Sequence, residues 1–315
     1  MTEVTILLSV YNGSRWLQDQ LDSILYQSFT SWKLIIRDDG SQDDSIRIVS
    51  QYVSNHPNKI TLINDNHGNV GVKNSFNFLL KYADTSYIAF CDQDDYWMPE
   101  KLSKLVHLMK AKEINNGDKF PLLVHSDLEI TDENLIMINP SFFGFTGLSP
   151  QYSKSHVILF KNISPGCSML INQALLLKAG DVPANAIMHD YWFVLVARYF
   201  GKIFFYEESL VKYRQHGKNT LGAVKSSRLG WKDIYNNFFR YKKNSAGYWK
   251  KFKPYQKQSE CLLFLQGLSS KNRRAIESFI KISNENRGWK RKLDLLVNSL
   301  SCGSFKENLE FFLFA

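Results

Sequence analysis

Long apolar runs, clustered cysteines and a negative net charge are all missing from this sequence of 315 residues. No stretch approaches the roughly 20 apolar residues of a membrane-spanning helix, so we expect no transmembrane segment. The start, MTEVTILLSVYNG, has no basic segment followed by a long apolar one and does not resemble a secretory signal. The four cysteines show no CxxC spacing and no Cys/His metal pattern, which favours a reduced, cytoplasmic chain.

Three common nucleotide-binding and hydrolase motifs are absent as well. The sequence contains no GxxxxGK[ST] phosphate loop, no GxGxxG after its first predicted strand and no GxSxG elbow. These absences argue against P-loop, dinucleotide-binding and α/β-hydrolase chemistry. A composition of 44% hydrophobic and 22% charged residues is that of a globular protein and excludes a disordered or fibrous one.

The net charge of +9 is unevenly distributed. Residues 1–222 contain 20 Lys and Arg against 23 Asp and Glu, whereas residues 223–315 contain 19 against 7. This asymmetry indicates an anionic partner for the second segment, either a lipid surface or a nucleic acid.

Short apolar strands alternate with amphipathic helices over residues 1–130. The strands are predicted at residues 4–10, 33–37, 60–63 and 87–91, and the helices at residues 16–25, 45–53, 74–82 and 99–112. The alternation predicts an α/β fold with a mostly parallel sheet flanked by helices. Ligands of such sheets bind beyond the carboxyl ends of the strands.

The pattern is mixed after this region. It predicts a strand at 122–131, a loop-rich stretch at 134–152, a strong helix at 190–200 and a short strand at 202–206. The sequence after residue 222 is helical in pattern and rich in basic and aromatic residues. We therefore divide the chain into residues 1–222 and a helical C-terminal region, residues 223–315.

Two groups of carboxylates follow predicted strands. Asp38 and Asp39 come directly after strand 33–37, and Asp92 and Asp94 come directly after strand 87–91. Aspartates in tight turns can share one hard cation and the nucleotide bound to it, and Mg²⁺ or Mn²⁺ prefers such oxygen ligands. The alternative is that these aspartates only form turns and cap helices. Two such groups at adjacent sheet ends favour a metal–nucleotide site.

These segments resemble a known family. The strings SVYNG at 9–13, IIRDDGSQDD at 35–44, NxGxxxxxN at 69–77 and FCDQDDYWMPEKL at 90–102 are similar to those of inverting family 2 glycosyltransferases with a GT-A (Rossmann-like) fold. They most resemble bacterial rhamnosyltransferases of cell-wall and capsular polysaccharide synthesis. The resemblance implies that residues 1–222 form the catalytic domain of a nonprocessive sugar transferase.

The resemblance also implies the nucleotide-binding residues. Ser9 and Tyr11 match positions that line the nucleotide pocket, although packing at a strand end is the alternative. Asp39, with Asp38 beside it, matches the carboxylate that accepts a hydrogen bond from the pyrimidine ring. Two further residues, Gly71 and Lys73, match a loop that contacts base or phosphate.

The metal and the leaving group have their own matches. The resemblance assigns Asp92 to the ribose and the metal, and Asp94 to the Mg²⁺ or Mn²⁺ that holds the donor diphosphate. Arg214 and His216, in the string YRQH, match a segment that folds over the diphosphate and can neutralise leaving-group charge.

The general base falls in the string His189-Asp190. In the family the second residue of a Glu-Asp pair is the base, so Asp190 inherits that role. The alternative for Asp190 is a helix N-cap. His189 departs from the family pattern.

The preferred donor is dTDP-rhamnose, and UDP-hexoses and UDP-N-acetylhexosamines are alternatives; the preferred acceptor is a lipid-linked saccharide.

The segment 230–255 interleaves aromatic and basic side chains, which favours peripheral docking on the inner face of the plasma membrane. One alternative for this segment is a helical subdomain that packs on the core. Another is that the chain is a noncatalytic nucleic-acid-binding protein, but carboxylates in the central cleft argue against nucleic acid as a partner.

Overall fold

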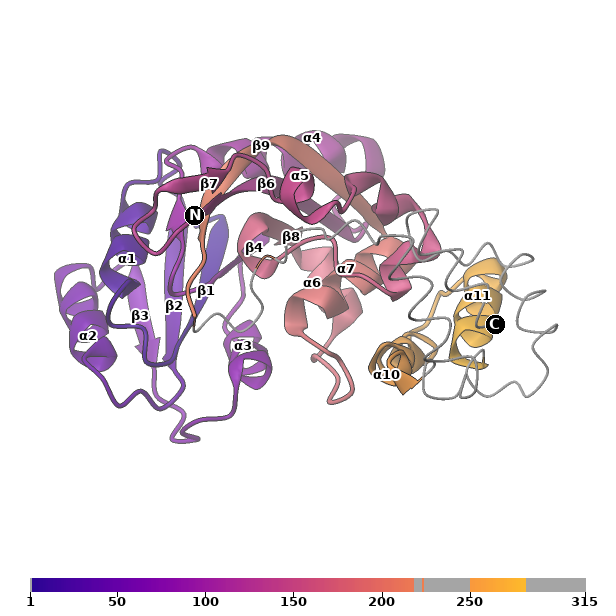
Figure 1. The fold of residues 1–315 in the computed structure, drawn as a ribbon, viewed down its shortest axis with the longest axis horizontal. Helices are drawn as coiled ribbons and strands as arrows, with labels where there is room; N and C mark the ends of the chain where they lie inside the picture. Colours follow the sequence, from indigo (N-terminus) through magenta and orange to yellow (C-terminus); the bar gives the residue numbers. More distant parts are fainter. Residues whose placement is uncertain (1, 218–222, 224–249, 282–315) are drawn as a thin grey trace, which may run out of the picture.

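The computed structural model of the chain describes residues 2–217, 223 and 250–281 (Figure 1). The N-terminal half is a parallel sheet with intervening helices, as predicted. Its strands are β1 (Val4–Val10), β2 (Trp32–Asp38), β3 (Ile60–Ile63) and β4 (Tyr87–Cys91). Its helices are α1 (Leu17–Leu25), α2 (Ser45–Asn55), α3 (Val72–Leu80) and α4 (Lys101–Asn116).

Five further strands extend this sheet. The strand order is β3-β2-β1-β4-β8-β6-β9-β5, with β7 paired to β6. Strand β8 pairs antiparallel with both β4 and β6, and β9 then runs parallel to β6. The added strands are β5 (Tyr96–Trp97), β6 (Leu122–Thr131), β7 (Met137–Asn139), β8 (Met169–Asn172) and β9 (Lys202–Arg214). The predicted α/β class is confirmed, and the sheet is mixed.

Two apolar cores cover the two faces of the sheet. Side chains alternate along β1, so Leu7 points into one core and its neighbours Ile6 and Leu8 into the other. The first core contains α3 and the buried face of α7 (His189–Phe200), while α1 and α4 contribute to the second. Burial on both faces explains why these strands read as continuous apolar runs in the sequence.

Two predictions for the second half are corrected. A strand is present at 202–206 as predicted, but its predicted end is wrong, because β9 continues to Arg214. Its polar second half pairs with β6 beyond a register shift at Ser126 and Asp127, and with β5 on its other edge. The stretch 134–152 is also more ordered than predicted. It contains β7, α5 (Phe142–Thr146) and the start of a 3₁₀ helix, η1 (Pro150–Lys154).

Short elements connect the sheet to α7. They are η2 (His156–Leu159), η3 (Gly166–Ser168) and α6 (Gln173–Ala179). The turn η3 runs directly into β8, so that it lies at the end of the sheet next to β4.

Two helices are described in the C-terminal region, α10 (Lys253–Leu262) and α11 (Ser270–Lys281), drawn in orange and yellow in Figure 1. Their apolar faces join the core that contains α7 through Leu262, Ile276 and Phe279. The prediction of helix holds for these residues, whereas most of the segment 230–255 lies outside the described residues. Among the described helices, none has the length and apolar character needed to cross a membrane.

The chain turns sharply between α7 and β9 at Gly201. A Cβ atom at this position would lie 2.0 Å from the carbonyl oxygen of Pro121, which is rigid backbone. We expect Gly201→Ala to lower the free energy of unfolding by about 1–3 kcal/mol, since the β6 and β9 starts must separate. Urea denaturation measures the change. Gly144→Ala is the matched control, because a Cβ there meets no atom nearer than 3.4 Å; equal losses for both variants would contradict the steric argument.

Candidate active site

The loops that follow β1 and β4 are joined by the side chain of Gln93. The backbone N–H of Tyr11 donates to Gln93 Oε1 at 2.8 Å, and Gln93 Nε2 donates to the carbonyl of Tyr11 at 3.0 Å. Gly13 leaves room for this contact, because a Cβ there would lie 2.3 Å from Gln93 Oε1. These two bonds tie the backbone of Tyr11, a half-exposed residue, to the Asp92–Asp95 loop.

The end of β9 closes over that loop through Arg214. Its Nε donates to the backbone carbonyl of Asp94 at 2.8 Å, and its Nη2 donates to a carboxylate oxygen of Asp19 at 2.9 Å. The guanidinium is buried and also donates to the carbonyl of Glu133 at 2.5 Å. Arg214 therefore positions the aspartate loop, a role that its sequence motif did not indicate.

His216 contacts Asp94 directly. Its Nε2 lies 2.8 Å from Asp94 Oδ2, and its ring stacks on Trp16 at 3.9 Å between centroids. These two predicted site residues, 122 positions apart in the chain, meet at one carboxylate.

The aspartate loop has an excess of negative charge. Burial and the charges of Asp94 and Asp190 raise the pKa of Asp92 to about 7. Burial also raises the pKa of Asp95 well above its usual range. A buried lysine, Lys101, lies beside them, and burial lowers its pKa to about 7. Its Nζ donates to the carbonyl of Cys167 at 2.7 Å and lies 3.1 Å from the centroid of the Trp97 ring.

This arrangement fits a hard divalent cation. Asp92 and Asp94 supply carboxylate oxygens at the carboxyl end of β4, where the sheet leaves space for a ligand. The charge of Asp94 helps to raise the pKa of Asp92, so a cation beside Asp92 would stabilise the ionised form of Asp92. The imidazole of His216 offers a further donor atom beside Asp94.

Asp190 lies in the first turn of α7. Its Oδ2 accepts from Asn162 Nδ2 at 2.9 Å and from the Gly166 N–H at 3.1 Å, and its Oδ1 accepts from the N–H of Tyr191 at 2.6 Å. Burial raises the pKa of Asp190 to about 6, although the three hydrogen bonds lower it. The carboxylate is therefore ionised and basic at neutral pH. The charge of Asp190 also helps to raise the pKa of Asp92, so the two predicted carboxylates lie within electrostatic range of each other.

His189 faces away from any polar partner. Its ring stacks on Phe76 at 3.9 Å, and neither ring nitrogen has a hydrogen-bond partner among the described residues. Burial lowers the pKa of His189 to about 3, so this residue is neutral beside Asp190.

Asp39 holds a second loop at the carboxyl end of β2. Its carboxylate accepts from the N–H groups of Val70 and Gly71, both at 2.9 Å, and from the guanidinium of Arg37. Arg37 is buried and also bonds Asp65. The predicted residues Asp39 and Gly71 are therefore in contact, whereas Arg37 was missed, although an arginine inside an apolar strand was a usable signal.

The remaining predicted residues lie around this loop. Asp38 Oδ2 accepts from the N–H groups of Gly40 and Ser41, at 3.0 and 2.9 Å, and so shapes the turn after β2. Ser9 Oγ donates to Ser75 Oγ at 2.6 Å. Lys73 extends away from the carboxylates, because its Nζ donates to two backbone carbonyls, Ala184 at 2.7 Å and Ala186 at 2.8 Å.

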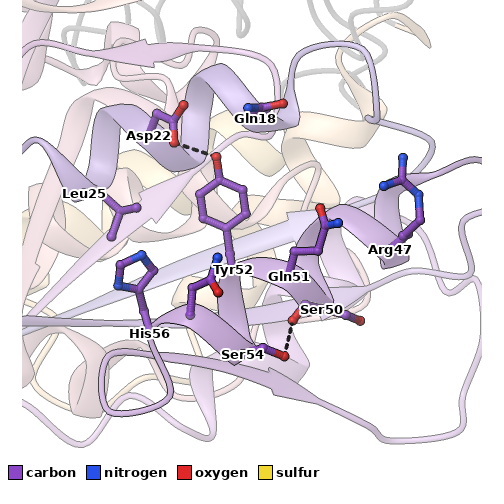
Figure 2. A pocket seen from close by; sticks show the side chains of 10 residues that line it. Gln18, Asp22, Leu25, Arg47, Ser50, Gln51, Tyr52, Ser54 and His56 are labelled. Carbon is purple, nitrogen blue, oxygen red and sulfur yellow. Dashed lines mark hydrogen bonds between the residues drawn. The ribbon is translucent and has the colours of Figure 1, made fainter.

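A polar groove between α1 and α2 contains none of these residues. Figure 2 shows Asp22, Tyr52, Gln51 and His56 lining it, with Tyr52 donating to Asp22 Oδ1 at 2.5 Å. Burial and the Asp22 carboxylate raise the pKa of Tyr52, which stays protonated. The groove is therefore separate from the carboxylate site.

Comparison with known proteins identifies the domain that carries the site. Residues 5–121 match the model of Glycosyl transferase family 2. These residues form a family 2 glycosyltransferase domain. The match spans β1 to β4 and includes both aspartate loops, and Asp190, Arg214 and His216 lie in the part of the fold that follows this domain.

Relatives of the glycosyltransferase domain extend over more of the chain. The dTDP-rhamnosyl transferase RfbG of Shigella flexneri is 25% identical over 249 residues, 74% of this chain and 81% of RfbG. The UDP-Glc:alpha-D-GlcNAc-diphosphoundecaprenol beta-1,3-glucosyltransferase WfgD of Escherichia coli is 27% identical over 183 residues, 57% of this chain and 64% of WfgD. The match covers only 38% of the length of one relative and 34% of another, so the chain does not span every relative that it matches.

Solved structures share the fold. S. aureus TarS 1-349 in complex with UDP-GlcNAc superimposes with a TM-score of 0.58 at 16% identity, over 94% of this chain and 78% of that one. The mannosyltransferase PcManGT from Pyrobaculum calidifontis, in complex with GDP-Man and Mn²⁺, gives a TM-score of 0.55 at 14% identity, over 96% of this chain and 76% of that one. The predicted GT-A architecture is confirmed.

Proposed function

We propose that the chain is a metal-dependent, inverting glycosyltransferase that moves a sugar from a nucleotide-sugar donor to a saccharide acceptor. The observation that carries the proposal is the position of Asp190: its carboxylate accepts from the N–H of Gly166, and the next residue, Cys167, has its sulfur within 4.8 Å of an Asp92 carboxylate oxygen. One ionised, basic carboxylate thus lies beside the carboxylates that fit a metal. A base and a metal–diphosphate site are the two parts that a single displacement at an anomeric carbon needs.

The donor nucleotide binds across the carboxyl ends of β1, β2 and β4 in this proposal. Ser9, Tyr11, Asp38 and the loop at Gly71 surround the base and ribose, and the Asp39 carboxylate faces the pyrimidine ring. The Asp39 carboxylate already accepts from the N–H of Gly71. In this proposal the same carboxylate contacts both the Gly71 loop and the base. Lys73 supports the loop that precedes α7, which links the donor side to Asp190.

The chain's own residues then move the proton and the charge. Asp190 accepts the proton of the acceptor hydroxyl, and the hydroxyl oxygen attacks the anomeric carbon from the face opposite the nucleotide, which inverts its configuration. Asp92 and Asp94 would hold Mg²⁺ or Mn²⁺, which would supply positive charge to the departing diphosphate. We assign His216, which contacts Asp94, to neutralise charge on the same diphosphate, and Arg214 holds the loop in place.

The finer proposal is L-rhamnose from dTDP-rhamnose, transferred to a lipid-linked saccharide in cell-surface polysaccharide synthesis. The name of RfbG supports the donor, and the name of WfgD supports a diphosphoundecaprenol-linked acceptor. UDP-glucose and UDP-GlcNAc are the alternative donors, which the names of WfgD and of the TarS complex suggest.

Incubation with a panel of nucleotide sugars and Mn²⁺ tests the proposal. Release of nucleoside diphosphate from dTDP-rhamnose, and an α-linked product from a β-L-rhamnosyl donor, are expected; a product with retained configuration would refute the mechanism.

We propose further that the segment 230–255 docks the enzyme on the inner, anionic leaflet of the plasma membrane. Each basic side chain near such a surface contributes about 1 kcal/mol. Flotation with anionic vesicles should recover the protein at low salt and lose it at high salt. Charge reversal at Lys242, Lys243, Lys250 and Lys251 should release the protein and spare donor hydrolysis, whereas equal binding to neutral vesicles would exclude this role.

The pKa of Asp190 sets the pH dependence that we expect. A base must be ionised, so kcat at saturating Mn²⁺ should fall as the pH drops through about 6. Saturating metal keeps Asp92 ionised, and His189, with a pKa of about 3, is neutral throughout this range. The acidic limb should be missing from the residual activity of Asp190→Asn. A wild-type profile that stays flat across the pKa of Asp190 would contradict the assignment.

A further inference from the structure

Cys167 lies against the carboxylates of the aspartate loop and has no part in the proposed transfer. One ligand atom from each of Asp92, Asp95 and Cys167 lies within 4.8 Å of the other two. Asp95 and Cys167 are fully buried, while Asp92 is partly exposed and connects the group to solvent. Cys167 forms no disulfide, so a free thiol faces two carboxyl groups.

A buried oxygen of Asp95 is the second, independent observation. Asp95 Oδ1 accepts from the backbone N–H of Arg214 at 3.2 Å, whereas Oδ2 receives no N–H or hydroxyl donor from the described residues and has the Cys167 thiol, a weak donor, as its side-chain neighbour. Buried carboxylate oxygens are normally satisfied by a donor or a cation. The charge of Lys101 acts on this group, but its Nζ donates to the carbonyl of Cys167.

We propose that Asp92, Asp95 and Cys167 form a binding site for a borderline or soft divalent cation, Zn²⁺ or Cd²⁺, next to the Asp92–Asp94 site for the activating metal. Sulfur selects such cations, whereas sites made only of oxygen suit Mg²⁺ and Mn²⁺. On binding, the Cys167 thiol releases its proton to solvent and a sulfur–metal bond replaces the S–H bond, without electron transfer.

Sharing of Asp92 makes the two sites exclusive. A cation at Cys167 removes one ligand from the activating metal, so Zn²⁺ or Cd²⁺ inhibits turnover by competing with Mn²⁺. Only this consequence rests on the proposed function; the binding site itself does not.

Cadmium titration of the full chain tests the site, because a thiolate–Cd²⁺ bond absorbs in the ultraviolet. Cys261→Ser and Cys302→Ser are introduced first, which leaves Cys91 and Cys167 as the two thiols. We expect the absorption to saturate with a single cadmium ion per chain, to persist in Cys91→Ser and to vanish in Cys167→Ser. Cys91 is the matched control, since its thiol is also buried and its Sγ lies 3.4 Å from the Asp92 carbonyl. Asp95→Asn should weaken Cd²⁺ binding by about tenfold or more.

Absorption that persists in Cys167→Ser, or is absent from the folded parent, would overturn the site. Circular dichroism checks folding, and Cys167→Ala replaces Cys167→Ser if the latter does not fold.

Inhibition of activity is measured separately. The Cd²⁺ concentration that halves donor hydrolysis at fixed Mn²⁺ should be about tenfold higher in Cys167→Ser than in Cys91→Ser. If Cd²⁺ produced the absorption but did not inhibit an active enzyme, the sharing of Asp92 between the two sites would be refuted. If Cd²⁺ produced the absorption in a chain without activity, only the proposed function would be refuted.

Discussion

Asp94→Asn should reduce sugar transfer by at least about 10³-fold, because the charge that holds the metal against the diphosphate is lost. The amide keeps the shape of the side chain and can still bond His216, so the fold should be unaffected. Removing the charge also relieves the repulsion that raises the pKa of Asp92. We therefore expect thermal stability equal to or slightly above that of the wild type, together with weaker Mn²⁺ binding by calorimetry.

Asp84→Asn is the control for this variant. Asp84 is an exposed carboxylate that pairs with Lys33 on the surface and lies before β4, whereas the aspartate loop follows β4. Its loss removes the same charge and should leave both transfer and Mn²⁺ binding unchanged. Full activity of Asp94→Asn, or of the wild type in excess chelator, would show that the reaction needs no metal at this position.

Asp190→Asn should lower kcat by about 10²–10⁴-fold with little change in donor affinity, which is the typical cost of losing a positioned base. Asn162 and the N–H of Gly166 donate to the carboxylate, and these donors keep it aimed and ionised. An amide at the same place cannot accept a proton. Single-turnover rates and donor binding, measured separately, distinguish loss of chemistry from loss of binding.

Asp181→Asn is the neighbouring control, since Asp181 lies exposed in the loop before α7. It should behave as the wild type in both measurements. If Asp190→Asn lost donor affinity and kcat equally, Asp190 would have to be part of the nucleotide site, and another residue would be the base.

The parallel half of the fold could be predicted because its signal is local. Strands buried on both faces are continuous apolar runs, and residues 4–10, 60–63 and 87–91 match β1, β3 and β4. The second half of β9 carries charged residues and lies at a sheet position that depends on β5 and β6. No local pattern encodes such a pairing, which is why the strand was cut short.

The sequence predicted which residues form the candidate site, but it did not predict the contacts between their side chains. Asp94 and His216 were both named, yet their contact depends on β9 reaching the aspartate loop. Lys101 read as part of an ordinary amphipathic helix, because a buried lysine looks the same in sequence as an exposed one. The partner of Asp190, Asn162, lies in a loop without any periodicity that could have singled it out.

The clasp between Gln93 and Tyr11 has a consequence for how this loop can evolve. A side chain at position 13 displaces the end of the flexible Gln93 side chain, and any shorter side chain at position 93 gives up both bonds to the Tyr11 backbone. Either substitution breaks the same two bonds, so the second adds little to the loss that the first causes, which makes the pair epistatic. A scan of single substitutions will score both positions as intolerant, so libraries aimed at new donor specificity should vary positions 13 and 93 together.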